Sequence, residues 1–151
     1  MRRSVSSFKG SYSYSVDNKG RINIPSKLRK YVQQEADSTF VITRGYDECL
    51  YVYPLDEWSK VERDASQLSS ADAKNRFYQR RLMENATESK LDGQFRIVIP
   101  KDLLQFAGIE NDVLIIGVLD HIEVWNPRKY NAYLAAQAES FESVAQTVLK
   151  K

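Results

Sequence analysis

The chain of 151 residues has a single cysteine, Cys49, and a single histidine, His121. An internal disulfide is therefore impossible, and a metal site of the usual cysteine and histidine type is not expected. Long hydrophobic runs are also missing. The longest apolar stretch covers residues 113–119, whereas a membrane-spanning helix needs about 20 residues. The sequence therefore predicts a chain with neither a disulfide framework nor a membrane-spanning helix.

The N-terminus begins Met1-Arg2-Arg3 and continues with serine, lysine and tyrosine, so it lacks the apolar segment of a secretory signal. We expect the cytoplasm as the compartment. No Ser/His/Asp set, glycine-rich phosphate loop or close pair of carboxylates stands out in the sequence. We therefore predict that the protein is not an enzyme and needs no cofactor or metal.

Positive charge is unevenly distributed along the chain. Residues 1–31 hold eight basic side chains and one acidic side chain, and residues 76–101 hold six basic and three acidic. The segments 32–75 and 102–151 are net acidic, and the whole chain carries a net charge of +2. A basic block folded onto one face attracts polyanions such as nucleic acids. The alternative, a solvated surface with charges of both signs, stays open at this point.

The chain contains an internal repeat. The segment DNKGRINIP at 17–25 returns 75 positions later as DGQFRIVIP at 92–100, and both fit the frame Asp-x-x-x-Arg-Ile-x-Ile-Pro-x-x-Leu. A second match joins residues 50–53 to 122–125. We interpret the chain as two copies of one module. The first copy with its closing helices is predicted at 1–85, the second copy at 86–135, and a C-terminal helix or tail at 136–151.

Both copies predict the same order of elements. A short strand leads into the Asp-x-x-x-Arg turn, and the Ile-x-Ile alternation predicts a second strand whose isoleucines face inward. Proline then ends this strand and opens a short helix, predicted over 26–32 in the first copy. An apolar stripe between 135 and 149 predicts a last helix, either detached from the body or swapped. The remaining strands are predicted at 12–16, 89–91, 40–43, 49–53, 113–118 and 122–125, and further helices start at Pro54, Asp72 and Pro127.

A single copy of about 70 residues buries little surface by itself. Two copies share one core if their hairpins interleave about a pseudo-two-fold axis. We therefore predict an α+β fold of two tandem swapped-hairpin modules with short flanking helices. This arrangement brings the two turns to related positions. It predicts a common basic face formed by Lys19, Arg21, Lys27, Arg29 and Lys30 of the first copy with Arg96 and Lys101 of the second.

The two turns have the composition of tight turns. Aspartate and asparagine hydrogen-bond their own backbone, and glycine supplies a positive φ. The arginine that follows each turn points outward from its strand and suits contact with a base edge or a phosphate. An ion pair between Arg21 and Asp17 is the alternative. The predicted turn-forming residues are Asp17, Asn18, Gly20, Asp92 and Gly93.

The doubled frame, with the segment YPLDEW at 53–58 and a helix carrying Arg76, Arg80 and Arg81, resembles the MraZ family of tandem AbrB-like swapped-hairpin repeats. The resemblance covers nearly the whole chain, from about residue 10 to 133. It implies a DNA-binding repressor that acts on the promoter of a bacterial division and cell-wall gene cluster. This promoter also controls the repressor's own gene. The resemblance also implies ring-like homo-oligomers on repeated sites of double-stranded DNA, associated with the nucleoid.

The second turn departs from the family pattern. Family members usually place glycine immediately before the arginine of each turn, as Gly20 does here. The second turn has Phe95 at this position and Gly93 two positions earlier. Phenylalanine does not readily take the left-handed backbone conformation. We therefore expect a differently shaped second turn, so that the family's DNA contact transfers less directly to Arg96 than to Arg21.

A function of another class stays open: a protein-interaction or assembly module whose basic face docks an acidic protein partner. DNA readout depends on both salt and sequence, whereas simple acidic docking depends on salt alone. For Arg76, Arg80 and Arg81 the preferred interpretation is ion pairing with acids of a neighbouring subunit, with DNA contact as the alternative. For Tyr12, Tyr14, Tyr51 and Tyr53 it is packing on a strand face, with base stacking as the alternative.

Overall fold

The computed structural model describes residues 6–150. The first copy consists of β1 (Ser11–Ser15), β2 (Arg21–Asn23), α1 (Ser26–Arg29), η1 (Gln34–Ala36), β3 (Thr39–Arg44), η2 (Tyr46–Glu48), β4 (Leu50–Pro54), α2 (Leu55–Ser66) and α3 (Ala73–Glu84). The second consists of β5 (Thr87–Lys90), β6 (Arg96–Val98), α4 (Lys101–Ala107), β7 (Asp112–Val118), β8 (His121–Trp125), α5 (Pro127–Ala135) and α6 (Phe141–Val148). Apart from the short η turns, both copies follow the same order of elements, as the repeat predicts.

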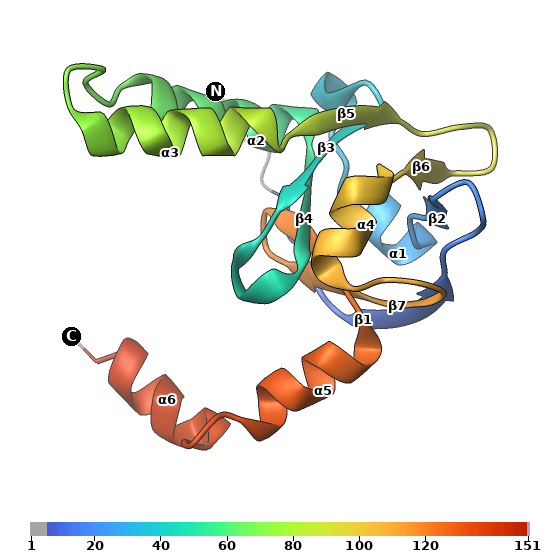
Figure 1. Cartoon of the computed structure of the whole chain (residues 1–151). Helices are drawn as coiled ribbons and strands as arrows, with labels where there is room; N and C mark the ends of the chain where they lie inside the picture. Colours follow the sequence, from blue (N-terminus) through green and yellow to red (C-terminus); the bar gives the residue numbers. More distant parts are fainter. Residues whose placement is uncertain (1–5, 151) are drawn as a thin grey trace.

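The two copies are interleaved within one chain (Figure 1). A six-stranded antiparallel sheet has the order β1-β7-β8-β4-β3-β5, and β2 pairs with β6 in a separate two-stranded ribbon. Strand β1 of the first copy pairs with β7 of the second, and β5 of the second pairs with β3 of the first. The pairs β4–β8 and β2–β6 complete the pseudo-two-fold relation. The predicted α+β fold of two swapped-hairpin modules is therefore confirmed.

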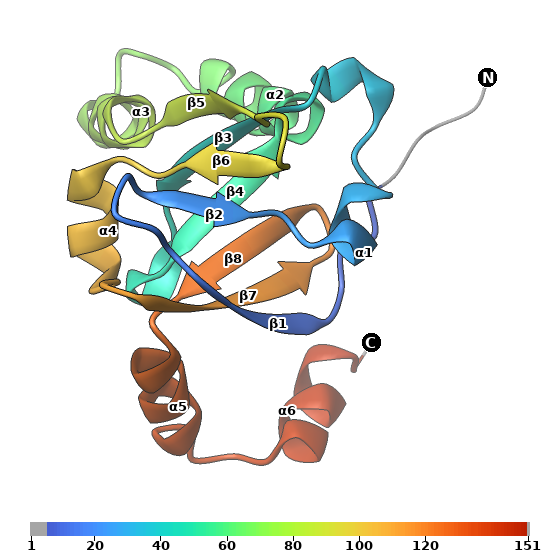
Figure 2. The ribbon, with the colours of Figure 1, turned by 90° about the vertical axis from the view of Figure 1, so that its right-hand side faces the viewer.

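One hydrophobic core joins the sheet, the β2–β6 ribbon and the helices α1 and α4 on either side of it (Figure 2). Burying one isoleucine or leucine side chain stabilises a fold by about 1.5–3 kcal/mol. The repeated Ile-x-Ile-Pro-x-x-Leu frame supplies six such side chains, each at most 2% exposed. The prediction that its isoleucines face inward is confirmed. The equivalent pairs are Ile22 and Ile97, Ile24 and Ile99, and Leu28 and Leu103.

The helix boundaries follow several sequence signals. The Asp72 side chain caps α3, and Pro127 lies in the first turn of α5, as predicted. The last helix predicted between 135 and 149 is present as α6 but is shorter than that range. Helix α5 ends at Ala135 and α6 begins at Phe141, because Ser140 caps a new helix with its hydroxyl oxygen. Within residues 6–150, no helix is long and apolar enough to cross a membrane.

Candidate nucleic-acid interface

The β2–β6 ribbon carries the two arginines of the repeat on one face. Ile22 and Ile97 are direct partners at its centre and are buried beneath it. Because side chains alternate along a strand, the neighbouring positions point to the opposite, outer face. Figure 2 looks onto this ribbon. The outer positions are Arg21 opposite Val98, and Asn23 opposite Arg96.

The first turn is closed by the Asp17 carboxylate. Its Oδ1 accepts hydrogen bonds from the backbone N–H groups of Lys19 and Arg21, both at 2.9 Å. Gly20 has a φ of +78°, and its carbonyl accepts a bond from the N–H of Ile99 at 2.8 Å. A Cβ atom at Gly20 would lie 2.6 Å from the Ile99 carbonyl oxygen. Both the backbone angle and the space therefore require glycine here.

The second turn repeats this geometry, so the expectation of a different shape is wrong. Asp92 Oδ1 accepts from the N–H groups of Gln94 and Arg96, both at 2.9 Å. Phe95 takes a φ of +62°, and its carbonyl accepts from the N–H of Ile24 at 2.9 Å. A left-handed residue other than glycine costs roughly 1–2 kcal/mol. The Asp92 bonds and the pairing with the other copy hold Phe95 in this conformation despite that cost.

Phe95 has a further partner from the first copy. The Arg29 guanidinium carbon lies 3.7 Å from the centroid of the Phe95 ring, and Arg29 Nε donates to the carbonyl of Ile24 at 3.0 Å. This cation–π contact lies beside the second turn. On the first turn, the neighbour of the Gly20 backbone is instead the Leu104 side chain. Leu104 occupies the position equivalent to Arg29, so the two turns share a backbone shape and differ in their side-chain support.

Each turn holds its arginine by the same contact. Arg21 Nε lies 2.7 Å from Asp17 Oδ2, and Arg96 Nε lies 2.9 Å from Asp92 Oδ2. Arg96 Nη1 is also 3.9 Å from Asp17 Oδ2, so one carboxylate lies near both guanidinium groups. These ion pairs hold each guanidinium group at its Nε atom and so fix its orientation. An oriented arginine fork of this kind suits bidentate contact with guanine or phosphate.

The turn carboxylates stay ionised well into the acid range. The backbone N–H of Arg21 has the largest effect on the pKa of Asp17. Desolvation opposes it, but the Arg21 side chain and the N–H of Lys19 add to the lowering, and the pKa of Asp17 falls to about 2. The backbone N–H groups of Arg96 and Gln94 likewise lower the pKa of Asp92. Both carboxylates therefore hold their arginines in place over the physiological pH range.

The other basic residues of the predicted face have unequal roles. Lys19 is exposed on the first turn, and Arg29 is half-buried in its contact with Phe95. Helices α1 and α4 flank the ribbon (Figure 2). The structure thus places Arg29 as a support of the second turn. The remaining lysines, Lys27, Lys30 and Lys101, are exposed on or directly after these helices. Arg2 and Arg3, which belong to the basic block at 1–31, lie outside the described residues.

Asn23 was predicted to face outward beside Arg21, but its contact with the second copy was not predicted. Its Nδ2 donates to the carbonyl of Gln94 at 3.0 Å, which ties the first copy to the second turn. The signal was its outward position within the repeat, but its acceptor lies 71 residues away in the chain. Gly93, unlike Gly20, has no positive φ, and a Cβ atom at Gly93 would meet no other atom within 4 Å.

The tyrosines of β4 lie in an aromatic cluster on the large sheet. The rings of Tyr51 and Tyr53 are 6.3 Å apart, and His121 lies 4.5 and 5.3 Å from them. These contacts agree with the preferred interpretation, in which Tyr51 and Tyr53 pack on a strand face. His121 also contacts Asp120 and Glu123. Among the described residues no cluster of three or more His, Cys, Asp or Glu side chains suits a metal ion.

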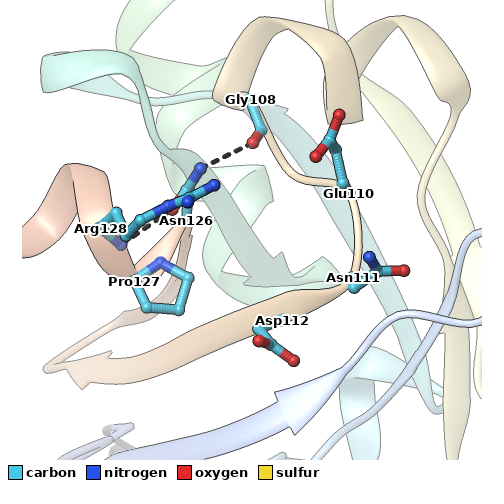
Figure 3. A pocket seen from close by; sticks show the side chains of 7 residues that line it. All are labelled: Gly108, Glu110, Asn111, Asp112, Asn126, Pro127 and Arg128. Atoms are coloured by element: carbon cyan, nitrogen blue, oxygen red, sulfur yellow. Dashed lines mark hydrogen bonds between the residues drawn. The ribbon is translucent and has the colours of Figure 1, made fainter.

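A small polar pocket of about 260 Å³ lies where α5 leaves the sheet (Figure 3). Asn126 lines this pocket, and both the amide nitrogen and the oxygen of its side chain contact backbone groups. Its Nδ2 donates to the Gly108 carbonyl at 2.8 Å, and its Oδ1 accepts from the N–H of Arg128 at 2.8 Å. Asn126 therefore anchors the start of α5 to the end of α4, and we call this pair of contacts the Asn126 joint.

The profile of the family described as "MraZ protein, putative antitoxin-like" matches residues 7–81 and matches again at residues 82–151. The chain belongs to the MraZ family. The two matches together span both copies of the repeat, in agreement with the resemblance that the doubled Asp-x-x-x-Arg frame indicates.

Several MraZ relatives are similar along nearly their whole length, and each bears the name transcriptional regulator MraZ. The protein of Halothermothrix orenii is 41% identical over 138 residues, 91% of this chain and 94% of the relative. That of Pediococcus pentosaceus is 39% identical over 142 residues, 94% and 96%. That of Acetivibrio thermocellus is 41% identical over 139 residues, 92% and 94%. A transcriptional regulator is not an enzyme class, in line with the predicted absence of catalytic chemistry.

Proposed function

We propose that this MraZ family member is a DNA-binding transcriptional repressor. The observation that carries the proposal is the β2–β6 ribbon, on which Arg21 and Arg96 lie on one outer face and are oriented by Asp17 and Asp92. The names of its relatives support a role in transcription. Its promoter is that of a bacterial division and cell-wall gene cluster that includes its own gene.

The ribbon is the element that enters the DNA. The major groove of B-DNA is wide enough for a two-stranded β-ribbon. Arg21 and Arg96 then reach base edges through their terminal nitrogens, since their Nε atoms are held by carboxylates. The exposed lysines Lys19, Lys27 and Lys101 contact phosphates on either side, which positions the ribbon and makes binding depend on salt.

The operator consists of repeated short sites, each occupied by one ribbon of a homo-oligomer. A single ribbon makes few base contacts, and linking several ribbons raises the affinity through effective concentration. We propose a ring of subunits that represses by occupying the promoter, in the cytoplasm and on the nucleoid. Within each subunit, residues 1–85 and 86–135 form the two halves of the DNA-binding unit, and residues 136–151 form a separate arm.

Fluorescence anisotropy with the promoter DNA upstream of the chain's own gene tests this proposal. The wild type, Arg21→Ala and Arg96→Ala are compared on the promoter and on a scrambled duplex across a salt series. Lys74→Ala is the matched control, because it removes one exposed positive charge at the start of α3, far from the ribbon (Figure 1). We expect Arg21→Ala to weaken promoter binding by about 1–3 kcal/mol, roughly 5- to 150-fold.

Two results decide against the proposal. Equal, salt-sensitive binding to both duplexes indicates a generic basic surface and favours the alternative, docking of an acidic protein partner. Absence of binding to either duplex at low salt removes the DNA function altogether. An equal loss of promoter affinity in Arg21→Ala and Lys74→Ala would show that the ribbon does not read the DNA sequence.

A further inference from the structure

Helix α6 presents an apolar stripe that its own chain leaves uncovered. None of its residues is buried, and Phe141 is 86% exposed. Val144 and Val148 lie on the same side at helical spacing and are also exposed. An isolated helix of eight residues is not stable in water. The contacts that stabilise α6 therefore come from a surface that the folded chain does not place against it.

A groove of matching character lies at the other end of the molecule. It has a volume of about 370 Å³ and lies between α3, α2 and the β3–β4 hairpin. Aromatic side chains dominate its lining, and Phe77 on its edge is 67% exposed. The aromatic residues of the groove are Tyr46, Tyr51, Tyr53, Trp58, Phe77, Tyr78 and Phe106.

Charge on the two surfaces is complementary. Two exposed acids, Glu139 and Glu142, lie at the start of α6. Two exposed arginines, Arg44 and Arg81, line the groove. The Arg44 guanidinium carbon lies 4.5 Å from the centroid of the Phe106 ring, so its charge is at the apolar wall itself. An amphipathic helix with acids at one end therefore fits this groove in both apolar pattern and charge.

The two surfaces lie at opposite ends of the chain. In both views α2 and α3 lie at one end and α5 and α6 at the other, with the large sheet between them (Figures 1 and 2). The Asn126 joint of Figure 3 fixes the start of α5 and so directs the α5–α6 arm away from the body. An arm at one end and a groove at the other favour head-to-tail contact, which closes into rings or extends as filaments.

We propose that α6 of one chain docks into the aromatic groove of a second copy. The apolar stripe at 141, 144 and 148 covers Tyr46, Phe77 and their neighbours, and the acids of α6 face the groove arginines. The inference rests on the homo-oligomeric part of the proposed function and names its contact surface. Its test contains no DNA, so its failure is distinguishable from a failure of promoter binding.

Sedimentation velocity of the full chain at micromolar concentration measures this contact. The arm variant carries Phe141→Ser and Val148→Ser, and the groove variant carries Tyr46→Ser and Phe77→Ser. All four side chains are exposed, so circular dichroism should show an unchanged fold. Leu119→Asn is the matched control, because Leu119 is equally exposed on the β7–β8 turn. We expect an oligomer for the wild type and the control, and a monomer for each of the two variants.

Mixing the two variants tests the pairing itself. Each variant retains one intact surface, so a head-to-tail contact predicts a one-to-one heterodimer and nothing larger. A groove variant that still assembles alone shows that arms pair with arms and overturns the inference. A monomeric wild type, or assembly unaffected in both variants, overturns it as well.

Discussion

Arg29 and Phe95 belong to different copies of the repeat, yet the Arg29 guanidinium lies against the Phe95 ring, 3.7 Å from its centroid. Arginine occupies this place only in the first copy, where it faces the turn that has phenylalanine in place of the glycine before its arginine. The contact therefore lies at the position where the two turns differ in the free-energy cost of a positive φ, which is higher for Phe95 than for Gly20. It links the support of the second turn to helix α1 of the first copy.

A double-mutant cycle measures this link. Arg29→Ala removes the cation–π contact and the bond to Ile24, but only the first depends on Phe95. We expect a coupling free energy of about 0.5–1 kcal/mol between Arg29→Ala and Phe95→Gly, from urea unfolding of the four proteins. Lys30→Ala in the same two backgrounds is the control. A coupling as small as that of Lys30 contradicts the prediction.

Glycine substitutions distinguish the first turn from a merely flexible loop. Gly20→Ala forces alanine to a φ of +78° and a Cβ to within 2.6 Å of the Ile99 carbonyl oxygen. We expect a loss of at least about 1–2 kcal/mol in the free energy of unfolding. Gly93→Ala, in open space on the second turn, should be neutral or stabilise by up to about 1 kcal/mol. Equal effects of the two changes in urea unfolding would contradict this account.

The turn carboxylates predict a loss of stability in acid. A carboxyl whose pKa is lower in the folded state stabilises the fold above its unfolded pKa of about 3.9. That contribution is lost as the pH falls toward the folded pKa, about 2 for Asp17. We expect the free energy of unfolding to fall between pH 4 and 2, and less steeply in Asp17→Asn. Asp102→Asn, exposed on α4, should retain the wild-type slope.

The single histidine gives one imidazole resonance to titrate by NMR. Burial opposes its protonation, but hydrogen bonds to the carboxylates of Glu123 and Asp120 outweigh this and raise the pKa of His121. We expect a midpoint above the usual value of about 6.5. Asp120→Asn should lower it, because one acceptor loses its charge, whereas Asp112→Asn should leave it unchanged. A midpoint below 6.5 in the wild type contradicts the prediction.

The flanking lysines and the ribbon arginines should differ in what they contribute to DNA binding. Lys27→Ala should weaken binding to promoter and scrambled duplexes equally, and reduce the slope of log affinity against log salt by about 1. Arg21→Ala should mainly reduce the preference for the promoter. Anisotropy over a salt series measures both quantities. Loss of promoter preference in Lys27→Ala would contradict this prediction, because it would assign sequence readout to the lysine.

The repeat made much of the fold predictable. A frame that recurs with the same apolar spacing places Ile22 and Ile97 in equivalent environments, and the structure pairs them at the centre of the ribbon. Turn composition correctly indicated tight turns at both aspartates. The exchange of β1 and β5 between copies follows from the need for a shared core, because each copy is small.

Contacts between distant segments were not predictable from local rules. The left-handed cost of Phe95 suggested a different turn, but the N–H of Ile24, from the other copy, binds its carbonyl and keeps the shared shape. The use of Arg29 as a support and the Asn23 bond to Gln94 also join residues far apart in the sequence. The break before α6 depended on a single cap at Ser140, which the apolar stripe did not reveal.

The exchange of strands also bears on synthesis of the protein. When the first copy has left the ribosome, β1 still lacks β7 and β2 still lacks β6. The surface that carries Arg21 and Arg96 therefore forms only after the second copy has been translated. A nonsense mutation or frameshift between the copies yields a product without this surface.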